Sequence, residues 1–139
     1  MEIERALVEL ARSDRWSDRV AAGQALVAYV GTPDADALLK DLLLDRADSA
    51  VIADTAASLL ERGDASAWRV FFSVWDVADP AQSDHLAGAL SGALFAASLS
   101  SEKAASIKRV VTLLSSDFDK HVRAGAKHLL PRMIEGLPD

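Results

Sequence analysis

Two histidines occupy equivalent places in neighbouring parts of this chain, and imidazole nitrogens are common metal ligands. His85 and His121 each directly precede an apolar residue that opens a pattern of small residues, and His128 follows His121 by seven positions. No Asp or Glu combines with these histidines in an arrangement that resembles a known zinc motif. The chain has no cysteine, which excludes thiolate ligands, disulfides and cysteine nucleophiles. We therefore expect surface histidines, with no metal and no other cofactor.

Basic side chains gather near the end of the sequence. Lys120, Arg123 and Lys127 fall on one face of a predicted helix, and the preceding predicted helix adds further basic residues. Such a patch can meet phosphate or an acidic protein, or it can be a solvated terminal face. Both interpretations remain open at this point.

Acidic side chains mark three predicted helices in the first two thirds of the chain. Asp54 and Glu61 lie seven residues apart on the polar face of one helix, and Asp18 and Asp84 lie on the two helices that flank it in the series. If these helices line a concave face, the four carboxylates form a shallow acidic groove for a basic partner. Otherwise they are solubilising charge.

The stretch DASAWRVFFSVWD, residues 64–76, holds four of the eight aromatic residues. At 100° per residue its apolar side chains fill a wider arc than a helix with two neighbours requires. Phe71 and Trp75 lie inside the arc, and we expect both to be buried. Trp68 and Phe72 at the margin are either covered by the next repeat or exposed as anchors for a partner.

Motifs of catalysis are missing from the sequence. It has no Gly-x-Ser-x-Gly, no glycine-rich phosphate loop, no His-Glu-x-x-His and no paired carboxylates in an apolar setting. We expect a protein that is not an enzyme.

The elements that must position these residues are helices, because apolar residues recur at i, i+3, i+4, i+7 and no segment alternates with period two. Gly31 and Gly63 follow apolar runs as helix-terminating glycines do. Thr32-Pro33 and Asp79-Pro80 are typical helix starts. The spacing predicts eight helices, over residues 2–12, 17–30, 33–44, 49–62, 65–77, 80–98, 101–115 and 118–131.

Composition narrows the class of protein. The 139 residues carry a net charge of −6, which argues against general nucleic-acid binding. Residues 1–100 hold eight basic and sixteen acidic residues, whereas residues 101–139 hold seven and five. No apolar run is long enough for a transmembrane helix, and residues 1–14 do not resemble a signal peptide. We expect one domain over residues 1–139, in the cytoplasm, and the Ala-, Asp- and Arg-rich usage suggests a bacterial source.

The second, fourth, sixth and eighth predicted helices share a pattern that begins at Val20, Val51, Leu86 and Val122. Ser17, Asp48, Ser83 or Asp119 stands three residues before each of them. The first, second and fourth of these are predicted caps, whereas Ser83 falls inside a helix. Asp119-x-x-Val122-Arg123-x-x-Ala126-x-x-Leu129-Leu130 resembles the second-helix motif of HEAT repeats, and the segment from Asp48 is a looser copy. The resemblance implies an all-α fold, a right-handed α-solenoid of about four HEAT-like antiparallel helix pairs.

The HEAT resemblance and the charge together favour a scaffold for protein–protein interaction. Its solenoid surface would bind a protein partner, in the most specific version a basic effector, and the chain would be a monomer or a weak homodimer. Trp68, Phe72, Asp18, Asp54, Glu61 and Asp84 are the expected partner-binding residues. The alternative is a HEAT-like enzyme or nucleic-acid-processing protein that acts through Lys120, Arg123 and Lys127, as some HEAT-like DNA glycosylases use a basic groove.

Overall fold

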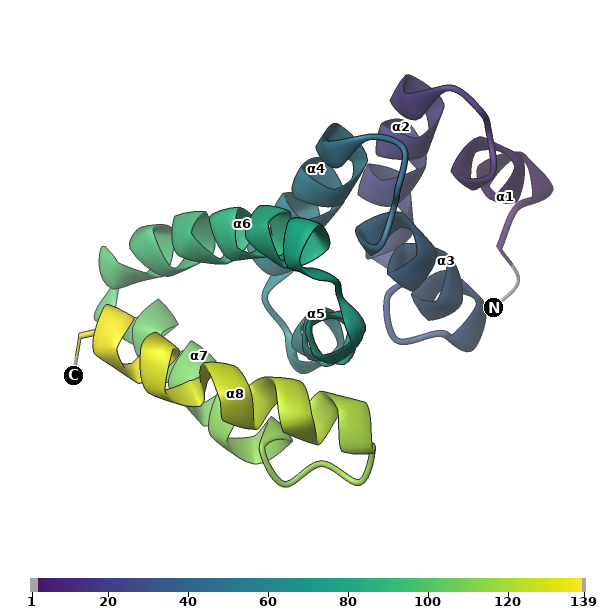
Figure 1. Ribbon diagram of the computed structural model, residues 1–139. Helices are drawn as coiled ribbons and strands as arrows, with labels where there is room; N and C mark the ends of the chain where they lie inside the picture. Colours follow the sequence, from purple (N-terminus) through teal and green to yellow (C-terminus); the bar gives the residue numbers. More distant parts are fainter. Residues whose placement is uncertain (1–2, 139) are drawn as a thin grey trace.

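The computed structural model describes residues 3–138, and within them every regular element is helical (Figure 1). The elements in chain order are α1 (Arg5–Ala11), α2 (Trp16–Leu26), the 3-10 turn η1 (Val27–Tyr29), α3 (Pro33–Leu43), α4 (Ser49–Arg62), α5 (Ala65–Val77), α6 (Pro80–Ser98), α7 (Ser101–Leu114) and α8 (Lys120–Gly136). The all-α prediction is confirmed.

Helix ends follow the local signals that the sequence carries. Gly31 and Gly63 have φ of +102° and +67°, the left-handed region in which a side chain is strained. Asp79 accepts a hydrogen bond from the Gln82 backbone, and the Gln82 side chain accepts one from the Asp79 backbone, a complete capping box. The bounds of α4, α5 and α6 therefore agree with those predicted.

Three helices differ from the prediction by more than one residue at an end. α1 covers only Arg5–Ala11, against the predicted residues 2–12. α2 begins at Trp16, so Ser17 lies inside the helix and is not its cap, and a 3-10 turn replaces its last residues. α8 continues through Pro131 to Gly136, five residues past the predicted end. Pro131 is exposed, so water can solvate the carbonyl that the missing N–H would have bonded.

The second helices of the first three pairs pack side by side, α2 against α4 and α4 against α6 (Figure 1). The α2–α4 contact is close, because a Cβ on Gly23 would overlap the Thr55 side chain. Ala22, Ala56 and Leu86 are fully buried along this series. Alanine and glycine let the helix axes approach, as the repeated small-residue pattern predicts.

The last pair departs from this series. α8 packs mainly against α5 and only marginally against α6, while α7 lies beside α8 (Figure 1). A Cβ on Gly125 would overlap the Phe72 backbone, so the α8 and α5 backbones touch at this glycine. A regular stack of repeats would instead place α8 chiefly on α6.

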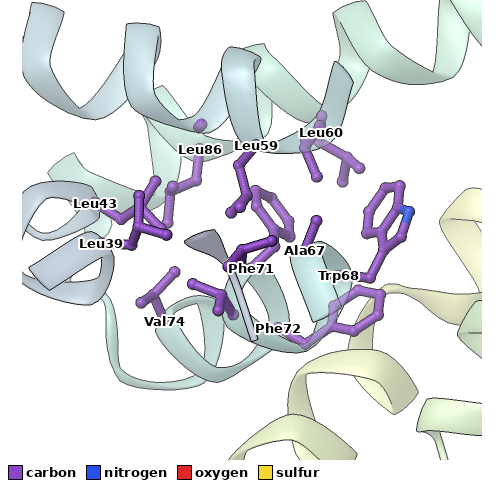
Figure 2. Close-up of a cluster of buried hydrophobic side chains, with 14 of the residues drawn as sticks. Leu39, Leu43, Leu59, Leu60, Ala67, Trp68, Phe71, Phe72, Val74 and Leu86 are labelled. Atoms are coloured by element: carbon purple, nitrogen blue, oxygen red, sulfur yellow. The ribbon is translucent and has the colours of Figure 1, made fainter. Parts of the chain in front are cut away.

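The buried side chains of α2–α8 form one continuous cluster. At its centre Leu39 and Leu43 of α3, Leu59 of α4 and Leu86 of α6 surround Phe71 of α5 (Figure 2). At the edge, Trp68 stacks on Phe72 with ring centroids 5.5 Å apart. α5 is therefore the element on which both halves of the chain pack.

Two ion pairs that are largely shielded from solvent connect helices to loops of other helix pairs. The Arg19 guanidinium donates to both carboxylate oxygens of Asp45, at 3.0 and 3.3 Å. The Arg69 guanidinium donates to those of Asp117, at 3.3 and 2.8 Å. Each pair fixes a helix to the loop that precedes another helix.

Among the described helices, none combines the length and the apolar character that crossing a membrane requires.

Candidate functional site

The aromatic side chains proposed as exposed anchors are covered. Trp68 and Phe72 are both 0% exposed, because α8 packs over this margin of α5 (Figure 2). In this structure they are core residues, and the interpretation of them as partner-binding anchors is corrected. Trp75, expected to be buried, is only half-buried, and its indole N–H donates to Nδ1 of His128 at 3.1 Å.

The three histidines each have different neighbours. Nδ1 of His121 lies 2.7 Å from the Asp76 carboxylate, His128 accepts the Trp75 hydrogen bond, and His85 lies beside a small depression at the N-terminal ends of α4 and α6. Within residues 3–138 no three His, Asp or Glu side chains come close enough to hold a metal ion.

The basic patch of α8 is partly used by the protein itself. Lys120 and Lys127 are exposed, whereas Arg123 is half-buried and donates to the Asp117 carbonyl at 2.8 Å. Arg19 donates to the Ser13 carbonyl in the same way, also six residues earlier in the chain. Arg123 thus has a structural contact, and two of the three cations project freely into solvent.

The four candidate acidic residues fall in different surroundings. Asp18 accepts a hydrogen bond from Ser13 at 2.7 Å and pairs with Arg15. Asp54, Glu61 and Asp84 are exposed. Glu61 is at the C-terminal end of α4 and Asp84 near the N-terminal end of α6, and these helices run in the same direction, so the two carboxylates lie at opposite ends of the pair.

One surface unlike an ordinary solvent-exposed helix face runs along α6 and its C-cap residue Leu99. We call its exposed residues after His85 the open face of α6. They stand at i, i+3, i+4, i+7, i+8 and i+11, one side of a helix, and they are Gly88, Ser91, Gly92, Phe95, Ala96 and Leu99. None is charged. Phe95 is 70% exposed and Leu99 77% exposed.

The corresponding parts of the neighbouring second helices carry charge. Glu61 of α4 and Arg132 of α8 stand at the position of Ala96, and Lys127 of α8 stands at the position of Ser91. A helix that is apolar all round is normally enclosed on all sides. The open face of α6 is therefore an apolar surface that the described chain leaves uncovered.

The glycines of this face also have no contact partner in the described chain. Gly23 and Gly125 each stand three residues after the leading valine of their helix, and each touches another helix. A Cβ on Gly88 or Gly92 would have no atom within 4 Å. Glycine costs a helix about 1 kcal/mol relative to alanine, and at these two positions no intrachain contact offsets that cost.

A groove runs along one edge of the open face, between α4, α6 and α7. It has a volume of about 590 Å³, within the usual range of binding sites. Its floor is Ala and Gly of α6, including Gly88, Gly92 and Ala96, and its walls carry Glu61 of α4 and Lys103 of α7. At the other edge of the open face, Arg132 of α8 donates to the Ser91 hydroxyl at 3.5 Å. The groove and the open face together form one depression bordered by charge.

Of the residues predicted from sequence, Glu61 lines this groove and Asp84 lies near the start of the open face. The glycines, Phe95 and Leu99 were missed, although a signal was present. The sequence has no charged residue between His85 and Glu102, too short a run for a membrane span but longer than one buried helix face needs.

The chain matches no model of a known protein family, no curated protein and no solved structure. The chemistry of its own residues therefore carries any functional assignment.

Proposed function

We propose that this chain is a non-catalytic protein–protein interaction module whose contact surface is the open face of α6 and the groove beside it. The observation that carries the proposal is the exposure of Phe95 and Leu99 next to two glycines that nothing in the chain contacts. Large apolar side chains in an uncharged surrounding are the usual centre of an interface, because their burial supplies most of the binding free energy.

The dimensions of the surface favour a helix as the docking element. The open face extends from Gly88 of α6 to its C-cap Leu99, about 16 Å at 1.5 Å per residue. The glycines lower the surface between Phe95 and the α4 wall, which suits side chains at i, i+3 and i+4 of a docked helix. Asp54, Glu61 and Asp84 lie on the same two helices and favour basic residues on a partner.

The proposed framework is a degenerate right-handed solenoid of HEAT-like helix pairs. The α2–α4–α6 series and the Asp48 and Asp119 caps support this relationship. The contact of α8 with α5 does not follow the regular pattern. A packed framework of this kind presents its surface as a rigid body, so little conformational entropy is lost on binding.

The rival function, an enzyme or nucleic-acid-processing protein that works through Lys120, Arg123 and Lys127, has weaker support. Arg123 is engaged with the Asp117 carbonyl, and the two remaining lysines lie on a chain of net charge −6. Phosphate binding by a protein depends on several cations acting together.

Comparative affinity capture tests the proposed surface. Three tagged proteins are incubated with an extract of the source organism: the wild type, Gly92→Leu and Ala124→Leu. Leu at position 92 fills the open face but meets nothing in the chain, whereas Ala124 is exposed on α8, away from this face. Quantitative mass spectrometry should find a protein that the wild type and Ala124→Leu retain and that Gly92→Leu loses.

Equal retention of every captured protein by Gly92→Leu and the wild type would refute the proposed surface. Circular dichroism melts of the three proteins provide the folding control. Gly92→Leu should melt no lower than Ala124→Leu, because leucine is a better helix former than glycine.

A further inference from the structure

We propose that the occupant of the open face of α6 is a second copy of this chain, in a two-fold symmetric dimer with the two α6 helices antiparallel. The inference rests on the proposed function, since it takes the same surface to be an interface and names its partner. In an isologous interface the same surface patch of each copy meets the other, so the patch must be complementary to itself. The open face of α6 and its borders carry a projection and a depression, and also an acidic and a basic residue.

One side of α6 is complementary in shape to itself when it is reversed. Phe95 and Leu99 project from its C-terminal half, and Gly88 and Gly92 leave a depression in its N-terminal half. In an antiparallel pair centred near Gly92, the C-terminal half of each helix faces the N-terminal half of the other. Phe95 of each copy then fills the depression at Gly88 and Gly92 of the other.

The close approach of the two helices also follows from the residue types. Gly88, Gly92 and Ala96 are spaced four apart, so they form one ridge without side chains beyond a methyl group. Such a ridge allows two helix backbones to come into contact. Gly125 shows that this chain uses a glycine in this way, because the α8 and α5 backbones touch there.

Charges of opposite sign lie near the two ends of α6. Asp84 lies eight residues before Gly92, about 12 Å along the helix, and is exposed. Lys103 lines the groove beside Ala96 and Ala97 at the other end of α6, whereas its neighbour Glu102 does not. An antiparallel pair brings Asp84 of each copy toward Lys103 and the α7 N-terminus of the other, where a carboxylate is favoured.

Within one copy the two charges cannot pair, because the length of α6 separates them. The two-fold axis generates the Asp84–Lys103 approach twice, and a closed two-fold pair uses the same face of both copies.

Sedimentation velocity and light scattering over a range of low to high micromolar concentration test the dimer directly. The wild type and Ala124→Leu should show a concentration-dependent shift to twice the monomer mass. Gly92→Leu should raise the dimer dissociation constant by about tenfold or more, since the side chain separates the two backbones.

A charge exchange identifies the partner as a second copy. Asp84→Lys and Lys103→Asp should each weaken the dimer, because each places like charges together twice. The double variant Asp84→Lys/Lys103→Asp should restore it. Restoration is expected only if the two residues meet across the interface.

A wild type that stays monomeric throughout the concentration range overturns the inference, as does a dimer that Gly92→Leu leaves intact. The proposed function is judged separately. If the chain is monomeric and Gly92→Leu still loses a captured protein of different sequence, the open face binds another protein and only the second-copy assignment fails. If nothing depends on Gly92, both fail.

Discussion

At the scale of single residues, the Arg69–Asp117 pair is the clearest electrostatic device in the fold. Hydrogen bonds from the Arg69 guanidinium hold the pKa of Asp117 below its usual value, although burial works in the opposite direction. Backbone N–H groups of Val122 and His121 similarly lower the pKa of Asp119. Both carboxylates fix the loop before α8.

The lowered pKa values of Asp117 and Asp119 predict a loss of stability in acid. Each group has a lower pKa folded than unfolded, so near pH 4 the unfolded chain binds more protons and stability rises with pH. The contribution is complete above the unfolded pKa and is lost as pH falls through the folded one. Urea unfolding at several pH values gives the free energy of unfolding as a function of pH. Between about pH 5 and pH 3 this free energy should fall less steeply for Asp117→Asn than for the wild type. An unchanged slope would contradict the assignment of Asp117.

Two glycines of opposite role give a matched prediction. At Gly125 an added Cβ overlaps the Phe72 backbone, and at Gly92 it meets nothing. Gly125→Ala should lower the free energy of unfolding by about 1 to 3 kcal/mol, the usual cost of overpacking. Gly92→Ala should raise it by about 0.5 to 1 kcal/mol, because alanine favours the helix. Chemical denaturation at low protein concentration, where monomers dominate, measures both; a loss at Gly92 would mean that this glycine has an unseen intrachain role.

At the scale of helices, local capping chemistry made most bounds predictable. Asp48, Asp64 and Asp79 accept backbone hydrogen bonds at the starts of α4, α5 and α6, as their positions in the sequence indicate. α8 continues past its predicted end at residue 131, although a proline inside a helix usually breaks or kinks it. The exposed position of Pro131 removes most of that penalty, and exposure depends on tertiary packing, which spacing does not reveal.

The cap of α8 can be tested alone. Oδ1 of Asp119 accepts from the backbone N–H groups of His121 and Val122, at 2.9 and 3.2 Å. Asp119→Ala should lower the free energy of unfolding by about 1 kcal/mol, as is usual when an N-cap side chain is lost. Asp54→Ala removes an exposed carboxylate from inside α4 and should change it by less than about 0.5 kcal/mol. Equal effects of the two substitutions in thermal or urea unfolding would show that Asp119 stabilises nothing as a cap.

The site was less predictable than the helices, because it depends on which helix faces pack against one another in the tertiary structure. The wide apolar arc of α5 allowed two interpretations, a further covering element or an exposed margin, and the sequence did not decide whether Trp68 and Phe72 are covered or by which element. α8 does so because Gly125 fits against the Phe72 backbone. α8 then contacts α6 only near its end, and the open face stays uncovered. The uncharged run that contains the residues of the site can be recognised in the sequence, but the exposure of these residues cannot.

At the scale of the whole molecule, charge is divided along the chain. Residues 1–100 carry an excess of eight acidic residues and residues 101–139 an excess of two basic ones. Much of the basic excess is engaged, since Arg123 bonds the Asp117 carbonyl and Arg132 the Ser91 hydroxyl. The remaining field is acidic, and it favours approach by a basic partner and disfavours polyanions.

This charge distribution predicts how the molecule behaves toward heparin, a polyanion that mimics the phosphate backbone. The wild type should pass through a heparin column at physiological salt, because the few exposed cations of α7 and α8 on a chain of net charge −6 release too few counterions to offset the repulsion. Lys120→Ala/Lys127→Ala should elute at the same position, and this variant spares the structural contact of Arg123. Retention of the wild type that the double variant loses would instead locate a polyanion site on α8 and favour the nucleic-acid alternative. Retention that both proteins share and that Lys103→Asp abolishes would place an anion site in the groove, at the lysine on which the antiparallel dimer depends.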